Sequence, residues 1–135
     1  MKYLSTRDDS IRLSGAQAIV KGLSADGGLF VPDTLPQIGE AELAALLPLG
    51  YGERAKRILA AYLPEYSDAE LEALVSASYG KNFDTEAIEP VRFTDDKTGY
   101  LELWHGPTSA FKDMALQMLP HLLTASLKKC GRAHV

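Results

Sequence analysis

The residues best suited to chemistry lie close together in the stretch LELWHGPTSAFKDMALQ, residues 101–117. Lys112 follows the HGPTS turn by three residues, in the first turn of a predicted helix. The positive end of the helix dipole disfavours a second positive charge there, so it favours the neutral amine. A neutral amine is a nucleophile that can form a Schiff base with a carbonyl compound. The free backbone N–H groups of the same turn favour an anion nearby.

Each of these residues also has a purely structural interpretation. A lysine in a first turn can extend its amine to solvent while Asp113 balances its charge. Thr108 or Ser109 can serve as the N-cap of the helix. A histidine before a Gly-Pro turn is more often a structural hydrogen-bonding residue than a catalyst, so both roles remain open for His105. The residues alone therefore indicate a candidate site around Lys112 without deciding its use.

A hairpin and a helix would position this lysine. Residues 91–95 and 100–104 flank the turn DKTG and predict a β-hairpin that leads into the candidate site. A helix over residues 110–129 follows, and Pro120 within it should produce a kink. Its predicted apolar face comprises Phe111, Met114, Ala115, Met118, Leu119, Leu122 and Leu123. The final residues, RAHV at 132–135, suggest the start of another strand, so we interpret the sequence as the N-terminal piece of a longer protein.

The region before the hairpin predicts a helix-rich α+β unit. Residues 2–5 and 29–32 predict two short strands, and between them Ser14 and Gln17 form a capping box for a helix. Three helical segments follow within residues 40–82, and Ser67 and Glu70 form a capping box for the last of them. We find no chemistry in this helical region.

Composition limits the classes of protein to consider. The 135 residues suit one ordinary domain, with 46% hydrophobic and 24% charged residues. The net charge of −4 argues against non-specific nucleic-acid binding. No apolar run approaches the roughly 18 residues of a membrane span, and the first residues lack the hydrophobic core of a signal peptide. We therefore expect a cytoplasmic protein with no nucleic acid, membrane or metal partner, and we interpret the single cysteine, Cys130, as incidental.

Two motifs give the sequence a resemblance to a known family. HGPTSAFKD, residues 105–113, resembles the lysine motif of threonine synthase, a fold-type II enzyme of pyridoxal phosphate. Near the start, YLSTR and then GLSADGGLFVP resemble the N-terminal signature of the same family. Two motifs in the same order are far more specific than either alone. One departure is Asp8, which stands where family members often carry glycine.

The resemblance implies a pyridoxal-phosphate-dependent lyase. Lys112 would hold pyridoxal 5′-phosphate as a Schiff base, and Phe111 would help to bind this cofactor. The substrate O-phospho-L-homoserine would react with water to give L-threonine and phosphate. The other motif residues that would line or orient the site are His105, Thr108, Ser109 and Asp113.

The resemblance also implies an architecture and a limit. It implies a helix-rich α/β chain, with a small N-terminal α+β domain at residues 1–88 and the incomplete start of the fold-type II catalytic domain at residues 89–135. The family's glycine-rich loop that grips the cofactor phosphate is absent, so we expect this chain alone to be inactive and to bind cofactor weakly or not at all. Two alternatives are a related pyridoxal-phosphate lyase that acts on phosphorylated amino acids, and a non-catalytic structural domain.

Overall fold

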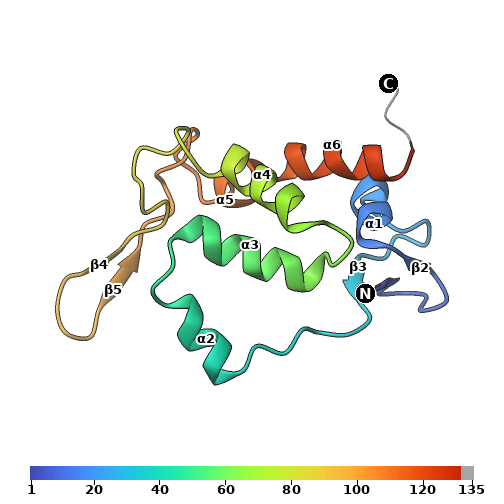
Figure 1. Ribbon diagram of the computed structural model, residues 1–135, viewed down its shortest axis with the longest axis horizontal. Coiled ribbons are helices and arrows are strands. Elements are labelled where there is room, and N and C mark those ends of the chain that lie inside the picture. The colour runs from blue at the N-terminus through green and yellow to red at the C-terminus, as the bar shows by residue number, and fades with distance from the viewer. Residues whose placement is uncertain (132–135) are drawn as a thin grey trace.

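The computed structural model describes residues 1–131, so the strand expected at residues 132–135 lies outside the described residues. A small sheet lies at one end of the molecule, helices occupy the middle, and a β-hairpin projects from the other end (Figure 1). The predicted helix-rich α+β architecture is thereby confirmed. Within residues 1–131, no helix combines the length and the apolar character needed to cross a membrane.

The N-terminal sheet has the strand order β2-β1-β3, and both pairings are antiparallel. It comprises β1 (Tyr3–Ser5), β2 (Arg12–Leu13) and β3 (Phe30–Pro32). Helix α1 (Gly15–Lys21) follows β2 and begins with the predicted capping box of Ser14 and Gln17. The Tyr3 hydroxyl donates a hydrogen bond to the carbonyl oxygen of Tyr62 (2.7 Å), which attaches the sheet to the end of α3 (Tyr51–Tyr62).

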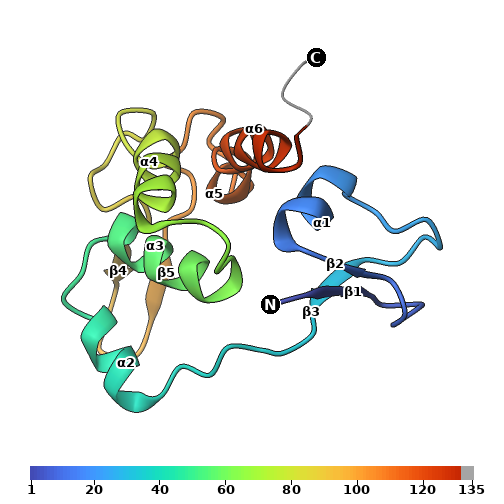
Figure 2. The same ribbon diagram turned by 45° about the vertical axis from the view of Figure 1, so that its right-hand side comes forward.

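The core lies where four helices meet. Helix α3 packs on α4 (Asp68–Ser78), α4 packs on α6 (Leu119–Lys129), and α1 packs along α6, as Figure 2 shows. The predicted capping box of Ser67 and Glu70 begins α4. The buried residues of this core are Ala16, Leu63, Tyr66, Leu71, Leu74, Val75 and Met118.

Helix α2 (Glu40–Leu46) lies outside this core and buries none of its residues. Its C-terminal end is held by Arg54 of α3. The guanidinium group of Arg54 donates hydrogen bonds to the carbonyl oxygens of Leu46 (3.1 Å) and Leu47 (2.9 Å). These two bonds satisfy carbonyl groups that a helix end otherwise leaves without partners.

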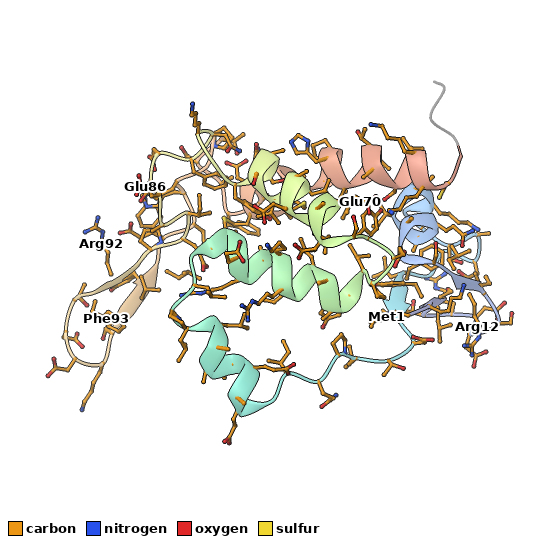
Figure 3. All side chains as sticks on the ribbon, viewed as in Figure 1. Met1, Arg12, Glu70, Glu86, Arg92 and Phe93 are labelled. Carbon is orange, nitrogen blue, oxygen red and sulfur yellow. The ribbon has the colours of Figure 1, made fainter. Side chains whose placement is uncertain are left out.

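The predicted hairpin is present but shorter than expected. Strand β4 (Val91–Phe93) pairs with β5 (Gly99–Leu101), with Val91 opposite Leu101. The Asp95 carboxylate accepts hydrogen bonds from the backbone N–H groups of Lys97 (2.8 Å) and Thr98 (2.9 Å), so residues from Asp95 onward form the turn. Every residue of both strands is exposed, and Figure 3 shows Phe93 on the hairpin, away from the helices.

The single helix predicted over residues 110–129 is wrong. The structure has a short helix α5 (Asp113–Leu116) and a separate α6 that starts at Leu119. Pro120 lies in the first turn of α6, where the N–H group that proline lacks would have no helical partner. The predicted kink is therefore absent, and the proline stands at the start of a helix. The predicted apolar face is also only partly correct, because Phe111 is 65% exposed and Leu119 is 50% exposed.

Candidate functional site

Lys112 lies at the N-cap position of α5 and is exposed. Among the described residues 1–131, its amine makes no hydrogen bond or ion pair. The prediction that it stands in the first turn of a long helix is wrong, since α5 begins one residue later and has four residues. A helix of one turn has few aligned peptide dipoles, so the dipole argument for a neutral amine loses most of its force.

A tight turn precedes the lysine. The N–H group of Ser109 donates to the carbonyl oxygen of Gly106 (3.0 Å), and Ser109 adopts a positive φ of 54°. That conformation is uncommon for a residue with a side chain. Neither Thr108 nor Ser109 caps α5, because the N-cap position belongs to Lys112 and has no side-chain hydrogen bond. The predicted capping role of these two residues is therefore wrong.

The side chain of Asp113 points into this turn. Its Oδ2 accepts a hydrogen bond from the backbone N–H of Thr108 (2.8 Å), and its Oδ1 accepts one from the Thr108 hydroxyl (2.9 Å). Asp113 is 1% exposed, and within residues 1–131 it forms no ion pair with Lys112. The structure thus brings the exposed Thr108 and the buried Asp113 together within the turn.

His105 is engaged through both ring nitrogens. Its Nε2 lies 2.8 Å from Glu102 Oε2, and its Nδ1 lies 2.5 Å from Asp84 Oδ1. The hydrogen bond with Glu102, followed by that with Asp84, raises the pKa of His105 above its ordinary value. The carbonyl oxygen of His105 also accepts from the N–H group of Asp84 (3.0 Å). His105 therefore joins the end of the hairpin to the loop before it.

Sequence reasoning missed the two acidic partners of this histidine, and the arginine that pairs with one of them. Glu102 is 6% exposed, and its other oxygen, Oε1, lies 2.8 Å from Arg92 Nε. A signal for Glu102 existed, because it is the one acidic residue in YLELW and precedes His105 by three residues. No local signal points to Asp84, which lies 21 residues before His105.

The side chains around Lys112 fit one end of an aromatic aldehyde cofactor. The amine is exposed and unpaired within the described part of the chain, as attack on an aldehyde carbon requires. Phe111 exposes 65% of its surface beside it, and an exposed aromatic ring can pack on a flat ring. The turn contains a single glycine, Gly106, and the side chain of Asp113 occupies the space where a side chain at that position would lie. The residues present therefore suit attachment of pyridoxal phosphate through its aldehyde, but they do not form a binding site for its phosphate group.

Comparison with known proteins places these features in a family. The family model described as "Threonine synthase N terminus" matches residues 2–79. Threonine synthase of Pseudomonas aeruginosa is 39% identical over 131 residues, which cover 97% of this chain and 28% of that protein. Threonine synthase-like 1 of Homo sapiens is 38% identical over 110 residues, covering 79% of this chain and 15% of that protein.

A solved structure agrees with the sequence matches. The crystal structure of pyridoxal-phosphate-bound threonine synthase from Brucella melitensis superposes with a TM-score of 0.90 at 38% identity, covering 97% of this chain and 28% of that chain. The chain belongs to the threonine synthase family, and it carries the N-terminal part of that family's sequence. It spans about a quarter of the length of the threonine synthases that it matches, at 28% of the P. aeruginosa protein.

Proposed function

We propose that this chain is the N-terminal part of an enzyme that converts O-phospho-L-homoserine and water into L-threonine and phosphate with the help of pyridoxal phosphate. The observation that supports this proposal is the position of Lys112. Its amine is exposed and unpaired within residues 1–131, inside the motif HGPTSAFKD. When bound, pyridoxal phosphate supplies an electron sink for bonds at the substrate's α carbon.

The residues of this chain would hold that group and move protons. Lys112 would join it through a Schiff base, and the released amine would then carry protons at the α and β carbons of the substrate. Phe111 would pack beside the cofactor. His105, Thr108, Ser109 and Asp113 would shape the turn from which the lysine extends.

The chain supplies only part of such a site. The described residues around Lys112 do not form a backbone cradle for a phosphate group, and a Cβ atom at Gly106 would already meet Asp113 at 2.5 Å. We therefore propose that the 135-residue chain alone is inactive and binds the cofactor weakly. The division into an N-terminal domain at residues 1–88 and the start of the catalytic domain at 89–135 is part of this proposal, as is a cytoplasmic location. The net charge of −4 supports a small-molecule partner over nucleic acid.

A second candidate is a related pyridoxal-phosphate lyase that acts on phosphorylated amino acids. The similarity to threonine synthase-like 1 of Homo sapiens supports this second candidate. The two candidates differ in product and not in their use of Lys112. Release of phosphate from O-phospho-L-homoserine without formation of threonine would support the second candidate over the first.

One experiment tests the assignment of Lys112. A full-length enzyme that carries this segment is incubated with pyridoxal phosphate, reduced with borohydride and digested for peptide mapping. We expect the adduct on Lys112, its loss in Lys112→Arg, and its retention in Lys97→Arg, which alters an exposed lysine of the hairpin turn. Bound cofactor with the adduct on another lysine would contradict the proposal. Stoichiometric, tight labelling of the 135-residue chain by itself would contradict the claim that the chain is an incomplete site.

A further inference from the structure

A buried carboxylate directly follows the exposed lysine. Asp113 is 1% exposed, and within the described residues no cation pairs with it. An aspartate is rarely buried without a charged partner, because loss of hydration disfavours the ionised group. Here the two oxygens are satisfied by one residue, since Oδ2 accepts from the Thr108 N–H and Oδ1 from the Thr108 hydroxyl. We call this pair of hydrogen bonds the Asp113–Thr108 clasp.

The backbone of the turn packs closely against the Asp113 side chain at Gly106. A Cβ atom at Gly106 would lie 2.5 Å from the Cβ atom of Asp113 and 2.6 Å from its Oδ2, so no side chain fits there. Beyond Gly106, Ser109 holds a positive φ of 54°. Such a backbone persists where surrounding contacts impose it. Within the same turn, Asp113 meets both the N–H and hydroxyl of Thr108 and the backbone at Gly106.

The directions of Asp113 and of its neighbour Lys112 are linked through the backbone that joins them. Lys112 has helical backbone angles, with φ of −63° and ψ of −20°. Consecutive side chains on a helical backbone point in directions about 100° apart. When Asp113 turns inward to Thr108, Lys112 is therefore directed to another side. If the clasp opens, the backbone between residues 106 and 113 loses the contacts that fix this direction.

We propose that Asp113 is a positioning residue: through the clasp on Thr108 it fixes the backbone from which Lys112 extends, and it does not itself contact the cofactor. This inference rests on the proposed function of Lys112. It differs from the role suggested by sequence, in which Asp113 balances the lysine charge or lines the site.

The principal test replaces Asp113 by asparagine in the full-length enzyme. Asparagine keeps the shape but not the charge. Its Oδ1 can accept from the Thr108 N–H while its Nδ2 donates to the Thr108 hydroxyl oxygen, so two hydrogen bonds to an ionised group become two weaker neutral ones. We expect borohydride-trapped labelling of Lys112 by pyridoxal phosphate to slow by about tenfold, because both hydrogen bonds of the clasp lose their charged acceptor. We also expect kcat to fall while KM changes by less than about twofold, since the substrate loses no contact.

A matched control is available in the hairpin turn. Asp95 also accepts two hydrogen bonds, from the N–H groups of Lys97 (2.8 Å) and Thr98 (2.9 Å), but it is exposed. Asp95→Asn should leave the labelling rate of Lys112 and both kinetic constants unchanged. A rise in KM for Asp113→Asn with kcat unchanged would overturn the proposal, because it would indicate a residue that lines the substrate site.

Three further variants address the clasp without altering the carboxylate. Thr108→Ser keeps both hydrogen bonds and should label like the wild type, whereas Thr108→Val removes one and should slow labelling. Gly106→Ala should slow it as well, by displacing Asp113. If Asp113→Asn fails to fold, these variants decide, and labelling of Thr108→Val and Gly106→Ala at the wild-type rate overturns the proposal.

Labelling of Lys112 distinguishes failure of the positioning role of Asp113 from failure of the proposed function. If wild-type Lys112 is never labelled, the function assigned to Lys112 fails. If Lys112 is labelled equally in the wild type and in every variant, only the positioning role fails. Amide hydrogen exchange of Thr108 in the 135-residue chain gives a readout without cofactor, and we expect faster exchange in Asp113→Asn than in Asp95→Asn.

Discussion

In the helical core formed by α1, α3, α4 and α6 the buried residues are mainly apolar, whereas in residues 91–116 they are acidic. Leu71, Leu74 and Val75 of α4 are between 1% and 7% exposed. In residues 91–116 the buried side chains are Glu102 and Asp113. The large hydrophobic residues of that segment that are exposed are Val91, Phe93, Tyr100, Leu101, Trp104, Phe111 and Leu116.

The difference shows two ways of holding a backbone in place. Burial of apolar surface is strong but has no preferred direction, so it suits a core whose only task is stability. Hydrogen bonds to a carboxylate are directional and set the angle of a chain within a narrow range. The segment that carries Lys112 depends on the second kind, through the Glu102 contacts of His105 and the Asp113–Thr108 clasp.

The largest expected effect comes from the core. Leu71→Ala removes a side chain that is 1% exposed, and we expect the free energy of unfolding to fall by about 2–5 kcal/mol. Phe93→Ala removes a larger side chain that is 72% exposed on the hairpin, so we expect a change within about 0.5 kcal/mol. Urea denaturation of both variants measures the difference. Equal losses would contradict the contrast between the two regions.

A buried hydroxyl pair tests whether the core also depends on polar contacts. The hydroxyls of Tyr66 and Ser126 are hydrogen-bonded at 2.6 Å, and Ser126 also donates to the carbonyl oxygen of Leu122 (2.7 Å). Ser126→Ala removes the partner of the Tyr66 hydroxyl and should cost about 1–3 kcal/mol. Tyr66→Phe leaves Ser126 bonded to Leu122 and should cost less. Thermal unfolding of both variants gives the order, and the reverse order would contradict this explanation.

The ion pair between α4 and α6 should respond to acid. The hydrogen bond from Lys129, together with the backbone N–H of Ser67, lowers the pKa of Glu70 from 4.5 to about 2. A lowered pKa means that the stabilisation is present above pH 4.5 and is lost as the pH falls towards 2. Glu70 is 41% exposed, so solvent screening keeps the effect near 1 kcal/mol at most.

Glu70→Gln should remove this part of the acid dependence, and Glu86→Gln, in an exposed loop, should retain it. Unfolding by urea at a series of pH values between 7 and 2 makes the comparison. The idea fails if Glu70→Gln and the wild type lose stability in parallel over that range.

The smallest effect concerns His105 and is local. Its pKa is raised, chiefly by Glu102 and then by Asp84, so the protonated form is the stabilising one. The stabilisation is complete below the ordinary pKa of 6.5 and is lost as the pH rises through the raised value. We expect exchange of the hairpin amides to accelerate over that interval beyond the intrinsic effect of pH. His105→Gln should show the intrinsic effect alone, and an identical pH profile in wild type and variant would exclude this role.

Sequence patterns predicted the features that depend on neighbours along the chain. Each of the two capping boxes joins residues three positions apart, so local chemistry determined them. The strands β1 and β3 were predicted from their own residues, although Tyr3 pairs with the distant Pro32. The helix over residues 110–129 failed because its apolar spacing continues smoothly through Gln117 and Met118. Nothing in that spacing shows that Asp113 turns inward or that Ser109 takes a positive φ. Both features go with side-chain and turn hydrogen bonds among residues 106–113, which hydrophobic periodicity does not record.

In the candidate site, the sequence predicted Lys112 but not the contacts that hold the surrounding backbone. The motif HGPTSAFKD located Lys112, whereas the argument from the helix dipole assumed a helix that is absent at that position. The contact of His105 with Asp84 spans 21 residues and leaves no periodic trace in the sequence. The buried position of Glu102 could not be inferred from its place between Leu101 and Leu103, because alternation along a strand would turn the leucines inward and Glu102 outward.

The packing of α1 along α6 has a consequence for synthesis of the protein on the ribosome. Ala16 belongs to the core together with Met118, so segments near opposite ends of the chain complete the same apolar cluster. An emerging chain that stops before α6 leaves the buried face of α1 uncovered, and exposed apolar surface on a partial chain promotes aggregation. The core can therefore close only after translation has passed Lys129, and contacts so distant in sequence slow folding further.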